Sequence, residues 1–234
     1  MKKISIIIPV YNEVRLFEKV YDNLMKFKPI DSIDKELIII DDYSTDGTRE
    51  LIKKIDSVNV ITIFNDKNYG KGYAVRKGIE KMSGDFFVIH DADLEYNTSE
   101  INKLLKIAIN TEADVVYGSR FLSGEFKRVL FFWHTVGNKF LTTLSNIFSD
   151  LNFTDMETCF KLIKKDIVQN FTLEENRFGF EPEITAKIGK LNKIKNLKIY
   201  EIGISYNGRT YSEGKKINWK DGFAAIKSII KYNF

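Results

Sequence analysis

The sequence predicts an α/β protein with a mostly parallel sheet and helices on both faces. Short apolar runs alternate strictly with longer segments whose apolar residues recur at helical spacing. Strict alternation of this kind favours parallel strands joined by helices. The chain has 234 residues, of which 44% are hydrophobic, so it can bury one large core. Because ligands of such sheets bind beyond the carboxyl ends of the strands, we expect functional residues there.

Each expected element follows from its local pattern. The runs at 4–9 and 36–40 are largely apolar and too short for helices, and Leu16, Val20 and Leu24 share one face of a helix. Ser44, Thr45 or Asp46 can cap the helix that follows the second strand. Strands are expected at 4–9, 36–40, 58–64 and 85–90, with a fifth centred on Val115 and Val116. Helices are expected at 13–28, 48–55, 68–82 and 98–109.

Composition excludes several classes of protein. The single cysteine, Cys159, rules out an intramolecular disulfide framework and a cysteine-based zinc site, which fits a reducing cytoplasm. The first residues do not resemble a signal peptide, and the longest apolar runs are far too short for a membrane span. A net charge of +4 is too mild to indicate nucleic acid, although it suits an anionic substrate or lipid surface.

Three carboxylates follow the strand expected at 85–90. Asp91, Asp93 and Glu95 stand at alternate positions, so in extended chain they share one side. Hard oxygen ligands suit Mg2+ or Mn2+, which complete their coordination with water and substrate phosphates. A metal site that receives a phosphate-bearing substrate is therefore expected here. The alternative is that these carboxylates only cap the next helix.

Two further loops carry carboxylates at the same edge, at 9–13 and 41–47. No glycine precedes Gly47, which excludes the glycine-rich turn of a dinucleotide fold and a P-loop. Phosphate must then be held by a metal ion and by cationic side chains. Lys71, in the loop 68–72, is a candidate for such a cation. The alternative is that this loop only begins a helix. For Asp46, a structural role in the turn or as a helix cap is the alternative to a role in the site.

Five motifs in order resemble a known family. They are Ile-Ile-Pro-Val-Tyr-Asn-Glu at 7–13, Asp-Asp-Tyr-Ser-Thr-Asp-Gly at 41–47, Asn-Tyr-Gly-Lys-Gly at 68–72, Asp-Ala-Asp-Leu-Glu at 91–95 and Gly-Ser-Arg-Phe at 118–121. Together they resemble family 2 glycosyltransferases of the GT-A fold, most closely the polyprenyl (dolichyl) phosphate mannose or glucose synthases. The resemblance implies a Rossmann-like GT-A domain at 1–210 and a C-terminal, acceptor-side extension at 211–234.

The resemblance also implies roles for individual residues. Pro9, Tyr11, Glu13 and Asp42 would bind the base and ribose of a nucleotide sugar. Asp91, Asp93 and Glu95 would bind the metal, with Asp91 also at the substrate. Arg120, Arg209, Lys71 and Lys215 would be the cations that contact phosphate. A surface arginine in a flexible loop is the alternative for Arg209, whose Gly- and Lys-rich surroundings also suit a lid over an anion.

Asp155 occupies the position where the family has an aspartate near the acceptor. A phosphate acceptor scarcely needs a base, because it is largely dianionic at neutral pH, whereas a hydroxyl acceptor would require Asp155 as base. The chain has Thr-Cys-Phe-Lys at 158–161 where many polyprenyl phosphate synthases have Ser-Gly-Phe-Arg, which leaves the acceptor open. Glu157 and Cys159 are expected to be structural, and neither His90 nor His134 is assigned to catalysis.

Two stretches bear on the acceptor. Phe132, Trp133, Val136, Phe140, Leu144, Ile147 and Phe148 fall at helical spacing after Lys127 and Arg128, and Trp219, Phe223, Ile226 and Ile230 form a second stripe. We expect core packing with an exposed aromatic edge for the first stripe. An interfacial membrane helix is the alternative, because Phe131 lies off the stripe beside two cations. The same two interpretations apply to the C-terminal stripe.

The sequence thus predicts an inverting, metal-dependent enzyme that transfers a hexose from a nucleotide diphosphate sugar, of the GDP-mannose or UDP-glucose type, to a polyprenyl phosphate. We expect it in the cytoplasm, peripheral on the cytoplasmic face of the membrane, without nucleic acid. One alternative is a family 2 transferase acting on a sugar hydroxyl, in a surface polysaccharide or a small soluble acceptor. A sugar-phosphate nucleotidyltransferase would need a glycine-rich loop after its first strand, and this sequence has none there. A non-catalytic binding module would be expected to lose one acidic metal ligand, whereas this sequence keeps all three.

Overall fold

A seven-stranded mixed sheet organises the part of the chain that the structure describes. The structure is a computed structural model and describes residues 2–122, 126–129, 131–214 and 219–234. The strands are β1 (Lys3–Val10), β2 (Asp34–Asp41), β3 (Val60–Phe64), β4 (Phe86–Ile89), β5 (Val115–Ser119), β6 (Lys161–Lys164) and β7 (Ile199–Gly203). Their order is β3-β2-β1-β4-β6-β5-β7, and only β6 runs antiparallel to its neighbours.

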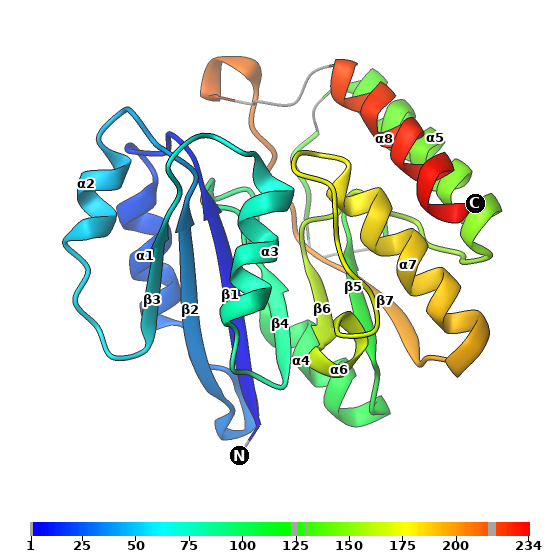
Figure 1. Ribbon diagram of the computed structural model, residues 1–234, viewed down its shortest axis with the longest axis horizontal. Coiled ribbons are helices and arrows are strands. Elements are labelled where there is room, and N and C mark those ends of the chain that lie inside the picture. The colour runs from blue at the N-terminus through cyan, green and yellow to red at the C-terminus, as the bar shows by residue number, and fades with distance from the viewer. Residues whose placement is uncertain (1, 123–125, 130, 215–218) are drawn as a thin grey trace.

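Helices cover both faces of the sheet (Figure 1). The α-helices are α1 (Phe17–Lys26), α2 (Thr48–Lys53), α3 (Lys71–Lys81), α4 (Glu100–Thr111), α5 (Phe132–Ser149), α6 (Lys165–Val168), α7 (Phe180–Lys195) and α8 (Trp219–Asn233). Short 3-10 turns lie at η1 (Ile30–Ser32) and η2 (Tyr211–Glu213). α3 and α7 lie in front of the sheet in Figure 1, and α1 and α4 lie behind it. Asn102 of α4 ties these two helices together, because its side chain bonds Lys28 and Ile30 just after α1.

The expected α/β class is confirmed, and the expected elements begin and end a few residues from the observed ones. α1 starts at Phe17 rather than at residue 13, because the backbone N–H groups of residues 12–14 donate to side chains in the segment 44–48. β1 and β2 are buried almost throughout, as their continuous apolar runs predict. β6 and β7 were not predicted. β7 carries intermediate exposure along its length, so it lacks the apolar run that marks the central strands.

Helix α5 contradicts the expected core packing. Its buried positions are Thr142, Ser145 and Ser149, whereas Phe132 and Trp133 are 70% and 76% exposed. The small polar face packs inward because α5 lies against α7 and α8, where Gly189 of α7 approaches Ser149 too closely for a larger side chain. The aromatic stripe therefore faces outward. Helix α8 behaves similarly, with Phe223 and Ile230 exposed and Ile229 buried.

Candidate active site

One cavity of about 850 Å³ lies at the carboxyl ends of the central strands. The predicted site residues that line it are Pro9, Tyr11, Glu13, Asp42, Lys71, Asp91, Asp93, Glu95, Arg120 and Arg209. These residues come from six separate segments of the chain. The fold brings these segments together at the carboxyl ends of the strands, where ligands of parallel sheets bind. Lys215 lies outside the described residues, and Asp155 is not among the described residues that line the cavity. His90 is buried and bonds Thr98, while His134 lies on the cavity wall.

The loop after β2 is fixed by Asp42. Its carboxylate accepts bonds from the amide of Asn65 at 2.7 Å and from the backbone N–H groups of Tyr69 and Gly70 at 3.0 and 2.6 Å. Gly70 has a φ of +104°, and an added Cβ there would lie 2.5 Å from the carbonyl oxygen of Asn176. Asp42 therefore holds the loop 68–70 against the segment that precedes α7, in addition to lining the cavity.

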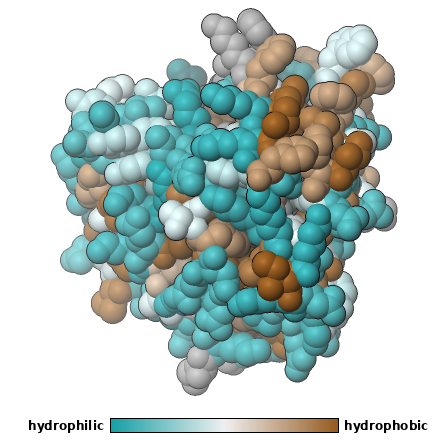
Figure 2. Space-filling view, turned by 45° about the vertical axis from the view of Figure 1, so that its right-hand side comes forward, coloured by the Kyte–Doolittle hydropathy of each residue, from teal (hydrophilic) through white to brown (hydrophobic). Residues whose placement is uncertain are grey.

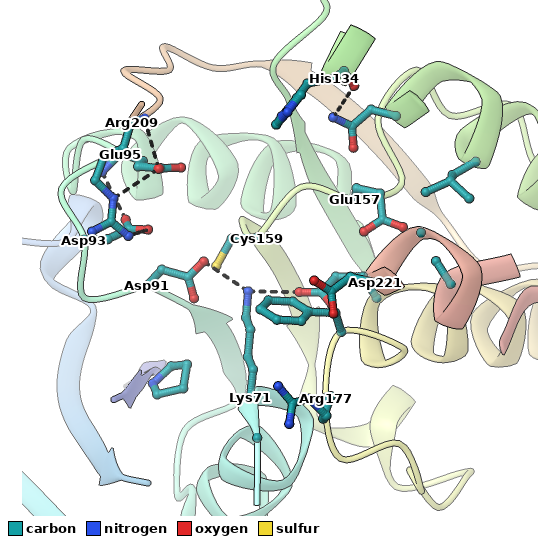
Figure 3. A pocket seen from close by; sticks show the side chains of 18 of the residues that line it. Lys71, Asp91, Asp93, Glu95, His134, Glu157, Cys159, Arg177, Arg209 and Asp221 are labelled. Carbon is teal, nitrogen blue, oxygen red and sulfur yellow. Dashed lines mark hydrogen bonds and ion pairs between the residues drawn. The ribbon is translucent and has the colours of Figure 1, made fainter. Parts of the chain in front are cut away.

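Arg209 contacts three carboxylates from two of the motifs. Its guanidinium lies 3.0 Å from Asp93, 3.2 Å from Glu95 and 3.3 Å from Glu13. Burial, together with the charges of Asp91 and Glu95, raises the pKa of Asp93 to about 7. Tyr206 donates a further bond of 2.7 Å to Glu95. This corner of the cavity is thus rich in carboxylates, and Arg209 supplies much of the compensating positive charge, as Figure 3 shows.

Lys71 joins this corner to α7. Its Nζ lies 3.0 Å from Asp91 and 2.9 Å from Glu181, a residue in the first turn of α7. Burial opposes ionisation of Asp91, but the Lys71 charge prevails and lowers the pKa of that carboxyl. The Cys159 thiol is buried on the same wall, and burial raises its pKa well above the ordinary value. Lys71 thus lines the cavity at the edge where the sequence suggested a cation, and its role toward phosphate stays a prediction.

The three predicted metal ligands suit a hard divalent ion in their chemistry, since all are carboxylates at one end of the cavity. Burial and the charges of Asp91 and Glu95 raise the pKa of Asp93, and a divalent ion would neutralise the negative charge that these carboxylates share. Within the described residues, however, no group of three or more acidic, histidine or cysteine side chains stands ready to hold a metal. Arg209 contacts one oxygen each of Asp93 and Glu95, and Lys71 contacts one oxygen of Asp91, so these cations compete with an ion for the same carboxylates.

Asp155 is held away from the cavity by Arg120. The carboxylate is fully buried and accepts two bonds from the guanidinium, at 2.7 and 2.8 Å, and one from the Arg120 backbone N–H at 3.0 Å. Glu201 fixes the backbone of this segment by accepting the N–H groups of Thr154 and Asp155. Arg120, which does line the cavity, also stacks over the Tyr206 ring at 5.3 Å. Asp155 thus contacts Arg120, which lines the cavity, and is not itself among the described residues of the cavity wall.

Sequence reasoning missed several wall residues. Glu181, Arg177, Phe178 and Tyr206 line the cavity but lie in no recognisable motif, and Glu157 was expected to be structural although it lies on the wall. The signal for Glu181 was weak, because an acidic residue in the first turn of a helix is ordinarily explained by the helix dipole. An apolar stretch of wall is formed by Trp133, Phe140, Leu141, Phe223 and Ile226 from α5 and α8.

The fold and the clustered loops define a GT-A glycosyltransferase, as a solved structure illustrates. The glucosyl-3-phosphoglycerate synthase of Mycobacterium tuberculosis, crystallised with Mn2+, UDP and phosphoglyceric acid, superimposes with a TM-score of 0.73, covering 99% of this chain and 78% of that one. At 16% identity this likeness shows the fold alone. Residues 5–172 match the description Glycosyl transferase family 2. The chain belongs to that family, and the predicted family and fold are confirmed.

Two curated relatives are similar to this chain. The dolichol-phosphate mannosyltransferase of Pyrococcus furiosus is 28% identical over 218 residues, which cover 92% of this chain and 60% of the relative. The undecaprenyl-phosphate 4-deoxy-4-formamido-L-arabinose transferase of Yersinia pestis is 35% identical over 112 residues, covering 46% of this chain and 34% of the relative. The chain thus spans three fifths or less of the length of these relatives.

Proposed function

We propose that this protein transfers a hexose from a nucleotide diphosphate sugar to a polyprenyl phosphate, with inversion and with the help of Mg2+ or Mn2+. One observation carries the proposal. The cavity joins a corner of carboxylates and cations to a wall of aromatic and aliphatic side chains from α5 and α8. The first suits a diphosphate with its counterion, and the second suits a lipid. Both relatives carry a polyprenyl phosphate in their names, which supports the same acceptor class.

On the donor side, Pro9, Tyr11, Glu13 and Asp42 would hold the nucleoside. Asp91, Asp93 and Glu95 would hold the metal, which supplies charge neutralisation to the leaving diphosphate. Arg209 would then exchange its carboxylate partners for phosphate oxygens, because a guanidinium binds either anion in the same forked geometry. Lys71 would keep the Asp91 carboxylate oriented from the α7 side. Lys215, outside the described residues, is proposed as a further phosphate contact.

For the acceptor, we propose that Arg120, one of the cations that line the cavity, contacts the phosphate. A phosphate monoester already carries its nucleophilic charge at neutral pH, so it needs orientation more than a base. The buried carboxylate of Asp155 fixes the direction of Arg120, and we assign Asp155 this positioning role. Inversion by direct displacement requires the acceptor oxygen to lie opposite the leaving diphosphate, and we propose that Arg120 helps to place it there.

Helices α5 and α8 suit peripheral contact with a membrane. Hydrophobic side chains gather over these helices at the upper right of Figure 2. The exposed members are Phe131, Phe132, Trp133, Phe140, Ile147, Phe223, Ile230 and Phe234. Within the described residues, no helix is both long and apolar enough to cross a membrane. The exposed apolar side chains of α5 and α8 suit a membrane surface, and we propose that the protein lies on the cytoplasmic face of the membrane. We also propose that 211–234 is an acceptor-side extension of a catalytic domain at 1–210.

Thermal melts and a transfer assay test this function. The protein is first melted with Mn2+ and each of GDP, UDP, GDP-mannose and UDP-glucose, and the donor should raise the Tm most. Transfer of radiolabelled sugar is then measured to polyprenyl phosphate in vesicles and to soluble sugar hydroxyls. We expect lipid-linked product that requires a divalent ion. Faster transfer to a soluble hydroxyl acceptor than to polyprenyl phosphate would contradict the proposed lipid acceptor and favour the hydroxyl alternative. Activity in excess EDTA would contradict the proposed requirement for a metal ion.

A further inference from the structure

Two buried carboxylate oxygens on the cavity wall have no partner. Within the described part of the chain, four buried carboxylate oxygens lack a hydrogen bond, in Asp41, Glu100, Glu157 and Glu181. Those of Asp41 and Glu100 lie 3.1 Å from Arg49 and 2.9 Å from Lys103, so a cation compensates each. The oxygens of Glu157 and Glu181 have no such cation among the described residues, and both of these residues line the cavity.

Glu181 is held by one oxygen only. Its Oε1 accepts Lys71, while its Oε2 has no partner in the described structure. The residue is 4% exposed and lies in the first turn of α7, where the helix dipole favours a negative charge. An unpartnered carboxylate oxygen shielded from bulk water is costly, so this position favours a ligand that brings a donor. Because the last torsion of a glutamate is soft, a small rotation presents the oxygen to the cavity.

Glu157 lies on the same wall and interacts with Glu181. After burial, the charge of Glu181 is the largest influence that raises the pKa of Glu157, to about 8. The charges of Lys161 and Arg120 oppose this rise. Lys161 is fully buried, donates to the carbonyl oxygen of Thr158 and lies over the Tyr117 ring. The two glutamates thus interact through their charges on one wall of the cavity. In Figure 3, Glu157 lies across the cavity from Asp93, Glu95 and Arg209, with Lys71 between them.

We propose that Glu181 and Glu157 form a subsite that binds hydroxyl groups of the transferred sugar. The unpartnered oxygen of Glu181 needs a donor, whereas Glu157, whose pKa is about 8, carries a proton at neutral pH and can both donate and accept. A hexose brings several hydroxyl groups on one rigid ring, and each of them can donate and accept. Lys71 bridges Asp91 to Glu181, so a sugar attached to a diphosphate at the carboxylate corner reaches this pair. Glu181 and Glu157 would then help to determine which sugar is accepted. This inference rests on the proposed function, since it assumes a nucleotide sugar in the cavity.

Binding measurements separate the sugar from the nucleotide. Calorimetry with Mn2+ compares a nucleotide sugar with its nucleoside diphosphate, using the GDP-mannose or UDP-glucose that wild type binds. Glu181→Gln keeps an oxygen for Lys71 but weakens acceptance from hydroxyls, so it should weaken nucleotide-sugar binding by about 10-fold or more. Its affinity for the diphosphate alone should stay within about 2-fold, because no sugar hydroxyl is present. Glu157→Gln should follow the same pattern more weakly, and Glu174→Gln, which alters a solvent-exposed pair with Lys231, should change neither affinity.

Nucleotide sugars that each lack one hydroxyl group of the sugar allow a double-mutant cycle between that hydroxyl and Glu181. For wild type, removing the hydroxyl that faces Glu181 should cost about as much affinity as Glu181→Gln does, and in the variant the same deoxy donor should bind like its parent. Equal losses for nucleotide sugar and diphosphate, or no coupling at any hydroxyl, would overturn the subsite. If Glu181→Gln does not fold, the wild-type panel still decides, because uniform affinity for every deoxy donor excludes hydroxyl recognition. If wild type binds no nucleotide sugar at all, the proposed function fails first.

Discussion

Replacement of Asp155 by asparagine tests the buried ion pair that fixes Arg120 in the cavity wall. The carboxylate accepts three bonds from Arg120, of 2.7, 2.8 and 3.0 Å. Asparagine offers one oxygen and turns an NH2 group toward a guanidinium that can only donate. Arg120 then remains buried without its counter-charge, and breaking a buried pair in this way costs about 3–5 kcal/mol. For a chain of this size, each kcal/mol lowers Tm by roughly 2–4 °C.

Thermal melts of wild type and Asp155→Asn should therefore differ by roughly 6–20 °C. Glu80→Gln is the matched control, because the Lys77–Glu80 pair is solvent-exposed and should contribute less than about 0.5 kcal/mol. The double variant Arg120→Met with Asp155→Leu should be more stable than Asp155→Asn, since no unpaired charge remains. An Asp155→Asn protein that melts with wild type would refute the buried-pair reasoning.

Kinetics of the same variant distinguish a positioning residue from a base. If Asp155 orients Arg120, Asp155→Asn should raise KM for polyprenyl phosphate and leave the shape of the rate–pH profile unchanged, at a temperature where the variant is folded. A base that accepts the proton of a hydroxyl acceptor would instead lose about 10²–10⁴-fold in kcat when replaced. A loss of that size, together with a loss of the acidic limb of the profile, would return Asp155 to the catalytic role.

Three further outcomes are expected. Asp91→Asn or Asp93→Asn should abolish sugar transfer with an unchanged circular dichroism spectrum, because charge neutralisation is lost while packing is kept, and residual transfer in either variant would exclude that residue as an essential ligand. Arg209→Ala should lower kcat more than it weakens binding of the nucleoside diphosphate, which steady-state kinetics and calorimetry compare; equal effects would contradict a role in the transition state. The raised pKa of Glu157, about 8 against 4.5 when unfolded, means that the folded protein holds the extra proton between these values, so stability falls as pH rises from 5 to 8. Glu157→Gln should flatten that fall, so its Tm relative to wild type should be higher at pH 8 than at pH 5 by on the order of 10 °C, and parallel melting curves at both pH values would show that Glu157 does not titrate there.

The order of the sequence motifs was enough to predict the sheet edge where the site lies. β1, β2 and β4 are buried on both faces, so their apolar runs are continuous and each motif at 9–13, 41–47 and 91–95 is marked by the point where its run stops. Parallel strands place such points at one edge, which is why Glu13, Asp42 and Asp93 could be assigned to one site without a structure.

Which partner each side chain takes was decided only by the tertiary structure. Asp93 and Arg209 lie 3.0 Å apart although 116 residues separate them, and Glu181 meets Lys71 through a helix start with no motif. The helical spacing of the aromatic residues in α5 likewise could not predict that they face outward. A helical period shows that a helix has an apolar face, whereas the neighbours decide which face is buried, and here α7 and α8 accept the face of Thr142, Ser145 and Ser149. Local sequence determines secondary structure and the ends of strands, while long-range packing determines ion pairs and burial because these depend on residues far apart in the chain.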